Sequence, residues 1–433
     1  MALFAYLIFA AIPFGYRTIL YTFGESFNEY ATISLYARDA LLVLLIIFGM
    51  KRLWSARKLK WNEGRHVWLS LILGTCALVS VFFANEKALA LYNSLRLLML
   101  IGSALVIAGL LREKVIKLEK ICAVFAGGAV IQACIGLYQF LFQKSLGVWF
   151  LGESFLSSGI DDIAKVTVYG GKLIRAYGTF PHPNILSAFL VIGLVSFIYL
   201  WFVTPRKSLT KEIAISGGLF ITTLGIVLTF SRAAWVVATA AFFFITIIML
   251  SESRRREKTI NLLAIMITVA FVFGFFFSPL IFERSSLSFF ESSINQRLLY
   301  NEIGLEIIEK NIWGVGIGNQ VLYSINERTY ENLGMPEKMW QPVHNIYLLI
   351  GAELGILGLI IFLRLIVDII WRSKGKGSLL FIPTTMMLAL LFFGIADHFL
   401  WTLEPGRLMF WLVTGIIMGA PLEEKLVLEE KAA

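Results

Sequence analysis

Long apolar runs separated by short polar segments cover almost the whole chain. Most of these runs extend over about 20 residues, which is the length that a helix needs to cross the hydrocarbon core of a bilayer. The pattern therefore predicts about twelve membrane-spanning helices. The predicted spans are residues 2–22, 31–50, 67–84, 92–111, 121–142, 183–203, 213–230, 233–250, 260–280, 346–370, 379–396 and 408–420.

Basic residues gather in every second loop between these runs, in segments 51–65, 112–120, 205–211, 253–258 and 372–376. Short loops rich in Lys and Arg remain on the cytoplasmic side of a membrane. Both termini are then predicted to be cytoplasmic, and the intervening loops lie on the outer side. No basic residue precedes the first apolar run, so we interpret it as a retained helix and not as a signal peptide.

Composition agrees with a membrane protein and excludes a soluble domain. Of the 433 residues, 58% are hydrophobic and only 15% are charged, whereas soluble domains are less apolar and carry more charge. The net charge of +9 follows from the cytoplasmic loops, so we do not expect nucleic acid as a partner. We predict one all-α, polytopic domain over residues 1–433 in the cytoplasmic membrane, in contact with membrane lipid.

The longest polar stretch, residues 281–345, lies between the ninth and tenth predicted spans. Apolar residues recur at helical spacing between residues 294 and 308, which predicts an amphipathic helix within this large outer loop. The glycine-rich segment 313–318 resembles a nucleotide-binding loop, but no strand precedes it and the full spacing is missing. We interpret that segment as a turn and expect the large loop to form part of the active site.

Histidine is scarce, and three of the four histidines fall on the predicted outer side. These are His182, His344 and His398, whereas His66 adjoins a cytoplasmic loop. Histidine changes charge near neutral pH and is therefore suited to proton transfer. We favour structural roles for His66, His182 and His398. His344 stands between the large polar loop and an apolar run, where a lipid-borne substrate would meet a water-borne one, and is our catalytic candidate.

Three arginines on the predicted outer side, Arg175, Arg232 and Arg297, are candidates for binding phosphate. A guanidinium remains charged and can grip phosphate oxygens with two parallel hydrogen bonds. Several of them facing one cleft would hold a diphosphate without a metal, and no cluster of residues has the spacing of a metal site. Anchoring at the membrane interface is the alternative for each arginine.

Three further charges, Arg38, Asp39 and Arg96, fall within or near the outer halves of predicted spans. Charges at such depth are expensive, and they are usually paired or functional. An internal ion pair and a contact with substrate are equally compatible with the sequence.

The residues around His344 resemble a family signature. His344 and Asn345, followed by nine residues, Gly355, two residues and Gly358, match the pattern of O-antigen ligases. Other segments are similar to the wider superfamily of O-antigen ligases and polymerases and occur in its order: residues 178–184, residues 228–235, and Arg297 followed by residues 311–319.

This resemblance implies a membrane glycosyltransferase of lipopolysaccharide and cell-envelope polysaccharide biosynthesis. Such an enzyme transfers a glycan from polyprenyl (undecaprenyl) diphosphate to an acceptor hydroxyl at the outer face of the cytoplasmic membrane, and the resemblance implies no cofactor. It implies that His344 is the general base and that arginines bind the diphosphate. The diphosphate-binding candidates are Arg232, Arg297 and, more weakly, Arg175, and the supporting residues are Asn184, Asn345, Gly355 and Gly358.

Several alternatives remain open at the level of sequence. A lipid A core as acceptor defines a ligase, which the His344 pattern favours, a second lipid-linked repeat defines a polymerase, and a protein hydroxyl defines a protein O-oligosaccharyltransferase. Direct attack by one hydroxyl would invert the anomeric centre. A transporter or lipid flippase is the alternative from another class, but the chain has no internal repeat and its polar residues gather at one face.

Overall fold

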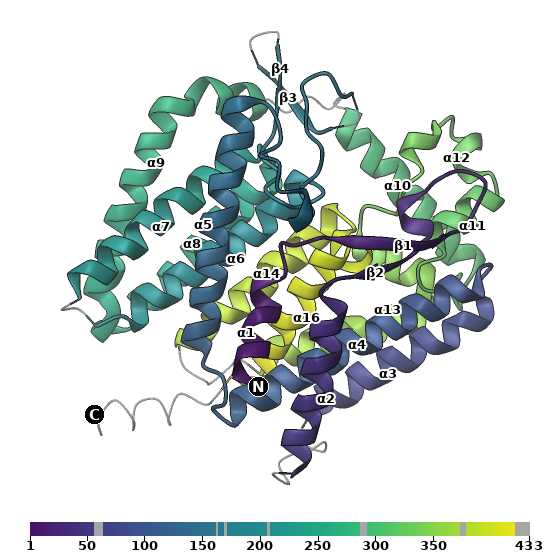
Figure 1. The fold of residues 1–433 in the computed structure, drawn as a ribbon, viewed down its shortest axis with the longest axis horizontal. Helices are drawn as coiled ribbons and strands as arrows, with labels where there is room; N and C mark the ends of the chain where they lie inside the picture. Colours follow the sequence, from purple (N-terminus) through teal and green to yellow (C-terminus); the bar gives the residue numbers. More distant parts are fainter. Residues whose placement is uncertain are drawn as a thin grey trace.

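The computed structural model describes residues 1–55, 64–161, 163–168, 171–205, 208–285, 292–372 and 378–420. Parts of the predicted cytoplasmic loops and of the large outer loop fall outside these residues. Helices make up 74% of the structure (Figure 1). A polytopic helical membrane protein is therefore confirmed at this level.

Eight helices among the described residues are long and apolar enough to cross a membrane. They are α3 (Arg65–Ser80, continued by the 3-10 turn η2, Val81–Phe83), α4 (Lys87–Arg112), α5 (Leu118–Phe142), α6 (Pro183–Val203), α7 (Leu209–Leu228), α8 (Arg232–Leu250), α9 (Arg256–Ser285) and α13 (Ile346–Trp371). The other predicted spans contain shorter helices, namely α1 (Ala2–Ala10), α2 (Asp39–Ser55), α14 (Phe381–Ala396) and α16 (Glu404–Gly419). The count of twelve spans stays a prediction.

Short elements connect these helices. Within the predicted large loop lie α10 (Ser292–Lys310), α11 (Gln320–Asn326), α12 (Thr329–Asn332) and the 3-10 turn η5 (Glu337–Met339). Helix α15 (Phe399–Thr402) joins α14 to α16. The remaining 3-10 turns are η1 (Glu29–Ala31), η3 (Trp149–Leu151), η4 (Ser253–Arg255) and η6 (Ser378–Leu380).

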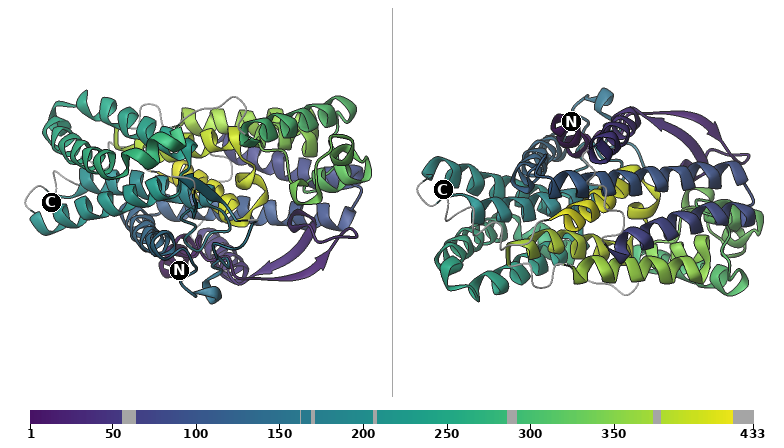
Figure 2. Two further views of the ribbon diagram at one scale, coloured as in Figure 1. Left: turned by 90° about the horizontal axis from the view of Figure 1, so that it is seen from above. Right: turned by 90° about the horizontal axis from the view of Figure 1, so that it is seen from below.

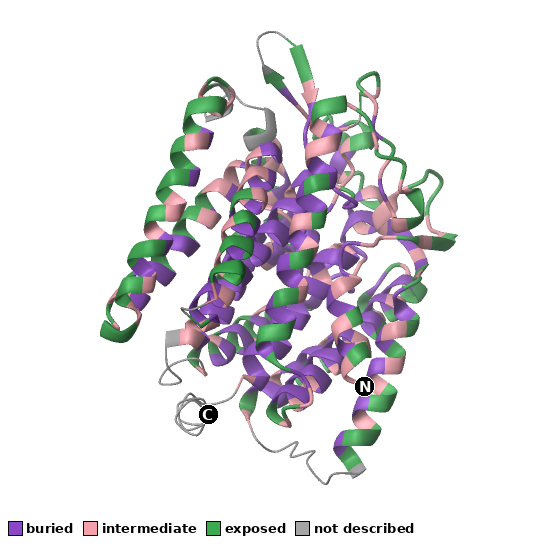
Figure 3. Cartoon of the chain, turned by 60° about the vertical axis from the view of Figure 1, so that its left-hand side comes forward, coloured by how far each residue is buried: buried purple, intermediate pink, exposed green. Residues whose placement is uncertain are grey.

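The helices pack around α6, whose apolar window is 94% buried within the protein. Helix α5 packs against α6 and α7, and α4 packs against α16 (Figure 1). Helix α9 lies at the periphery (Figures 1 and 3), and only 17% of its apolar window is buried. Its exposed side chains include Phe271, Phe275 and Phe276. An apolar surface of this kind is suited to contact with lipid, because monomeric soluble proteins rarely expose such large apolar patches.

The predictions of a single helix over residues 2–22 and of a single helix over residues 31–50 are wrong, because each segment contains a strand. Helix α1 ends at Ala10, and β1 (Arg17–Thr22) pairs antiparallel with β2 (Thr32–Tyr36). This hairpin crosses the outside of the helices (Figure 2). Both strands are rich in β-branched and aromatic residues, which fit a pleated, half-buried surface. Hydropathy therefore located an apolar segment correctly, but did not show that it changes from helix to strand.

A buried arginine holds the segment that follows the first helix. Arg38 donates from Nη1 to the carbonyl oxygens of Ile12 and Phe14, each at 2.9 Å. These carbonyls follow the end of α1 and have no helical partner, so the guanidinium satisfies them. A second hairpin, β3 (Lys165–Val168) with β4 (Gly171–Ile174), precedes α6. The two hairpins are additions to the predicted all-α class.

The ends of the helices fall into two groups that lie at opposite ends of the bundle. At one end, Lys258 at the start of α9 donates to the carbonyl oxygens of Trp201 and Thr204 at the end of α6. There too, Arg112 at the end of α4 donates to the carbonyl oxygen of Met418 in α16, at 3.0 Å. The predicted basic segments adjoin this end.

At the opposite end, α4 begins beside the start of α16, and α6 begins beside the end of α14. Arg407 donates from Nη2 to Asn93 Oδ1 at 2.9 Å, and Asn184 donates from Nδ2 to Asp397 Oδ2 at 2.9 Å. Helices α4 and α16 therefore run in the same direction, whereas α6 and α14 run in opposite directions. The two hairpins and α10–α12 lie at this end (Figure 1).

A buried ion network joins α2, α4 and α16. Arg96 Nη1 and Nη2 donate to the two oxygens of Asp39 at 3.0 and 2.9 Å. The same guanidinium contacts Glu404 Oε1 from Nη2 at 2.8 Å. All three side chains are nearly inaccessible to solvent. The sequence left open an internal ion pair or a contact with substrate for these charges, and the structure shows the ion pair for Asp39 and Arg96.

We predict that Arg96→Met lowers the free energy of unfolding by about 3–5 kcal/mol, because it leaves two carboxylates buried without their partner. Adding Glu404→Met should recover part of this loss, since it removes one of the stranded charges. Arg17→Gln is the control: its ion pair with Glu29 is partly exposed and should contribute about 1 kcal/mol or less. Unfolding of purified protein in detergent measures all three variants, and equal stability of Arg96→Met and wild type would contradict the prediction.

Candidate active site at a histidine cluster

Three histidines from distant parts of the chain meet at the end of the bundle that carries the hairpins. His344 immediately precedes α13, His398 follows α14, and their rings lie edge to face with centroids 4.8 Å apart. The ring of His344 also stacks on Tyr300 of α10 at 4.4 Å. His182 caps the start of α6 and acts electrostatically on both other histidines. The predicted outer histidines are therefore neighbours.

A chain of hydrogen bonds runs from Arg175 to a carboxylate in this cluster. Arg175 donates from Nε to the carbonyl oxygen of Thr229 at 2.6 Å and from Nη2 to Asn184 Oδ1 at 3.1 Å. The amide nitrogen of Asn184 in turn donates to Asp397 Oδ2 at 2.9 Å. Asp397 directly precedes His398, so the carboxylate has a fixed position beside the imidazoles.

Local hydrogen bonds select a tautomer for two of the histidines. His344 Nδ1 lies 2.9 Å from the carbonyl oxygen of Pro342. A carbonyl only accepts, so Nδ1 carries the proton and Nε2 keeps a lone pair that can accept one. His182 Nδ1 instead accepts from the backbone N–H of Asn184 at 3.2 Å, so its proton sits on Nε2. His344 is thus presented as a base and His182 as a donor.

Burial keeps the imidazoles neutral. It lowers the pKa of His344, which Arg297 lowers further while Asp397 raises it. Burial likewise lowers the pKa of His182 to about 4 and that of His398 to about 3. Burial alone would raise the pKa of Asp397, but the neighbouring histidines and the hydrogen bond from Asn184 hold it below its usual value. At neutral pH the site therefore combines a free base with a fixed negative charge.

The structure brings together most of the candidate site residues. Arg175 and Asn184 belong to the hydrogen-bonded chain just described. Arg297, on α10 one turn before Tyr300, acts electrostatically on both His344 and His182. Arg232 opens α8, three residues after the Thr229 carbonyl that Arg175 contacts. Arg232 is therefore linked to Arg175 by its place in the chain, whereas Arg297 is linked to His344 electrostatically.

The signature residues after His344 have backbone roles. Asn345 caps α13, and its Oδ1 accepts from the N–H groups of Tyr347 and Leu348 at 2.9 and 3.3 Å. Gly355 interrupts the helix with φ 73° and ψ 177°, a conformation essentially confined to glycine. Gly358 follows in the continuing helix, so the pattern describes a capped and broken helix start.

The segment that follows α10 forms hydrogen bonds with the backbone at this break. Ala352 and Glu353 each offer a carbonyl oxygen to the backbone N–H groups of Val315 and Gly316, at 2.9 and 3.0 Å. A Cβ on Gly314 would lie 2.4 Å from the carbonyl oxygen of Glu353. The glycine-rich segment is the turn that the sequence predicted, and its close approach to α13 explains its composition.

Sequence reasoning assigned His182 and His398 structural roles and did not single out Asp397. One signal was present: the predicted topology already placed all three outer histidines at the same face, and Asp397 adjoins one of them. Contacts such as the stacking of Tyr300 on His344 depend on how α10 folds back, and no local pattern indicates that.

Fold and cluster together describe a helical membrane protein with a group of titratable side chains where several of its helices begin or end. Residues 217–363 match the family model described as O-antigen ligase, which confirms the resemblance drawn from the sequence. This region carries Arg232, Arg297 and His344, and it supports a membrane glycosyltransferase of the ligase or polymerase type. His182 and His398 lie outside the matched region. No curated protein matches the chain.

We predict that Gly355→Ala destabilises the protein, because Ala is strained at positive φ and its Cβ would lie 2.4 Å from the carbonyl oxygen of Ile312. The backbone strain alone should cost about 1–3 kcal/mol. Gly217→Ala is the matched control, since a Cβ there meets nothing within 4 Å and alanine favours a helix. Unfolding in detergent compares the two variants, and equal stabilities would show that the break is not required.

Proposed function

We propose that the histidine cluster is the catalytic centre of a glycosyltransferase that moves a glycan from polyprenyl diphosphate to an acceptor hydroxyl, most similar to an O-antigen ligase. The observation that carries this proposal is the state of His344: its Nδ1 is held by a carbonyl, its Nε2 is available, and its pKa is lowered. A base that is neutral at physiological pH is what deprotonation of a hydroxyl requires.

In the proposed reaction, the acceptor hydroxyl donates a hydrogen bond to His344 Nε2. Its oxygen attacks the anomeric carbon of the donor sugar, and a new glycosidic bond forms. The bond from that carbon to the diphosphate oxygen breaks, and the electron pair leaves with the lipid diphosphate. The proton passes to Nε2, so the imidazole becomes positively charged. A single displacement of this kind inverts the anomeric centre.

Asp397 would stabilise the imidazolium that forms. Its negative charge already raises the pKa of His344 against the effect of burial. Asp397 acts on His344 electrostatically. A base that a third group orients or supports is a common feature of activated catalytic sites. His182, with a proton on Nε2, would donate a hydrogen bond to substrate or to the carboxylate.

Arginines would neutralise the leaving diphosphate. Arg175 and Arg297 both reach the histidine cluster electrostatically, and we assign Arg232 to the same group from its place at the start of α8. Cations held in fixed positions stabilise the negative charge that develops on a departing diphosphate, because they do not have to reorganise during the reaction. The mechanism therefore needs no metal ion.

The active site would face the extracytoplasmic side of the cytoplasmic membrane. The cluster lies at the helix ends opposite to those that adjoin the predicted basic, cytoplasmic segments. Polar groups gathered at one end of the bundle also suit a transferase better than a transporter, whose site lies near mid-membrane. Lipid A core, a growing glycan and a protein hydroxyl remain the acceptors to compare.

The first test is turnover of a polyprenyl-diphosphate-linked glycan by purified protein in detergent. We predict that His344→Ala lowers kcat by about 10²–10⁴, the contribution of a general base. Lys338→Ala, an exposed change in the same loop, should retain activity. Release of lipid diphosphate by wild type but not by His344→Ala supports the proposal, whereas equal turnover removes His344 as the base.

The second test is the pH dependence of kcat/KM. Protonation inactivates the base, and burial lowers the pKa of His344 from 6.5, so the acid limb of the profile should lie below about 6.5. Asp397→Asn removes the charge that raises this pKa, and the limb should move to still lower pH while kcat falls. A limb that moved upward in Asp397→Asn would contradict the assigned electrostatics.

A further inference from the structure

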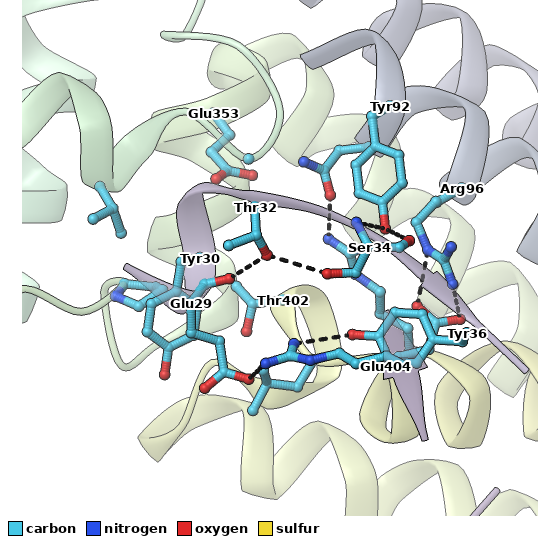
Figure 4. A pocket seen from close by; sticks show the side chains of 17 residues that line it. Glu29, Tyr30, Thr32, Ser34, Tyr36, Tyr92, Arg96, Glu353, Thr402 and Glu404 are labelled. Carbon is cyan, nitrogen blue, oxygen red and sulfur yellow. Dashed lines mark hydrogen bonds and ion pairs between the residues drawn. The ribbon is translucent and has the colours of Figure 1, made fainter. Parts of the chain in front are cut away.

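A polar pocket adjoins the histidine cluster beneath the β1–β2 hairpin (Figure 4). It contains about 50 Å³ of space that a water-sized group can enter, and it is partly open to solvent. The hairpin, α4, α16 and the segments that flank α11 and α15 supply its walls. The proposed reaction assigns no substrate group to this space.

The lining of the pocket combines arginines and glutamates with apolar surface. Its guanidinium and carboxyl groups belong to Arg17, Arg96, Arg407, Glu29, Glu353 and Glu404. The carboxyl groups disfavour an anion such as a diphosphate, and the charged groups in the wall disfavour a lipid chain. Carboxylates accept and guanidinium groups donate hydrogen bonds, and tyrosine rings offer apolar faces beside them. A neutral ligand with many hydroxyl groups, that is, a carbohydrate, would pair with these hydrogen-bond donors and acceptors.

Three residues of the pocket wall contact the histidine cluster. The ring of Tyr30, in the pocket wall, lies edge-on to His398 with centroids 5.2 Å apart. Thr402, also in the wall, places Oγ1 at 2.6 Å from His398 Nδ1. Pro342 lines the pocket as well, and its carbonyl oxygen is the one that fixes His344. A sugar in the pocket would therefore have hydroxyl groups close to the cluster.

The hairpin that forms the outer wall is held in place. Tyr92 of α4 donates from its hydroxyl to the carbonyl oxygen of Ser34 at 2.6 Å. Asn28, in the turn of the hairpin, donates from Nδ2 to the carbonyl oxygen of Trp340 at 2.9 Å. Deep in the pocket, the charges of Arg96 and Glu404 are fixed by each other. A site built on such supported groups is preorganised for a ligand.

We take the Arg17–Glu29 ion pair, 2.9 Å long, as the mouth of the pocket, because both residues line it and their side chains are 24% and 36% exposed. We propose that this pocket binds the carbohydrate portion of the acceptor and that the hairpin determines which sugar is accepted. The inference rests on the proposed transferase function and adds to it. It selects a glycan acceptor over a protein, because the wall is built for a polyhydroxylated ligand.

The test measures binding separately from turnover. Saturation-transfer NMR on the full-length protein in detergent would use three probes: a free core oligosaccharide released from lipid A, a free repeat-unit oligosaccharide, and a serine-containing peptide. Glu29→Gln and Arg17→Gln alter the mouth at a partly exposed ion pair, so both variants should fold. Glu25→Gln is the matched control, since Glu25 is exposed in the same hairpin and does not line the pocket.

We expect one of the two oligosaccharides to bind wild type, and Glu29→Gln to weaken that binding by about tenfold, as the loss of a charge-assisted hydrogen bond predicts. Glu25→Gln should bind as wild type does. In turnover, Glu29→Gln should raise the KM for the acceptor and leave kcat nearly unchanged. His344→Ala should still bind the oligosaccharide.

Failure to bind either oligosaccharide, equal binding by Glu29→Gln and Glu25→Gln, or binding of the peptide alone would each overturn the inference. Loss of binding in His344→Ala would do so too, because it would place the sugar elsewhere in the cluster. If the oligosaccharide binds but wild type releases no lipid diphosphate, the transferase proposal fails and the carbohydrate pocket stands.

Discussion

Helix α13 breaks at Gly355, and the arrangement of the site depends on how that break is filled. The carbonyl groups released around residues 352–353 accept from the N–H groups of residues 315–316, and the N–H of Ile356 donates to the carbonyl oxygen of Ile312. This segment directly follows α10, so the break anchors the end of the helix that carries Tyr300 and Arg297. His344 stands at the start of α13, and the stacking of Tyr300 on its ring joins the same two elements.

The histidine cluster lies where helices begin or end, and that explains its electrostatics. His182 precedes α6, His344 precedes α13, and Asp397 follows α14. Each of these residues lies where its helix begins or ends. The polar groups therefore meet at one end of the bundle, away from the surfaces that would face lipid. Packing of α10 and the hairpin over these ends then removes water and lowers the pKa values of the histidines.

The sequence predicted those features that depend on local pattern. Hydropathy located a helix in every predicted span, and spacing identified His344, Asn345 and Gly355, because capping and positive φ need particular residues. It did not show the strand at residues 17–22, since a short apolar run fits strand and helix alike. Nor did it show that His398 and Asp397 reach His344, because those contacts depend on helix packing between segments far apart in the chain.

Two chemically different environments meet at the histidine pair. On one side, Arg175 carries a positive charge that would suit a diphosphate, and Asn184 links it to Asp397. On the other side, Tyr30 and Thr402 contact His398 and belong to the wall of the pocket that arginines and glutamates line. A single displacement requires the nucleophile and the leaving group to approach one carbon from opposite faces. If His344 is the base, its position between a side suited to diphosphate and a side suited to carbohydrate would meet that requirement, and the hairpin that closes the second side would then contribute to catalysis.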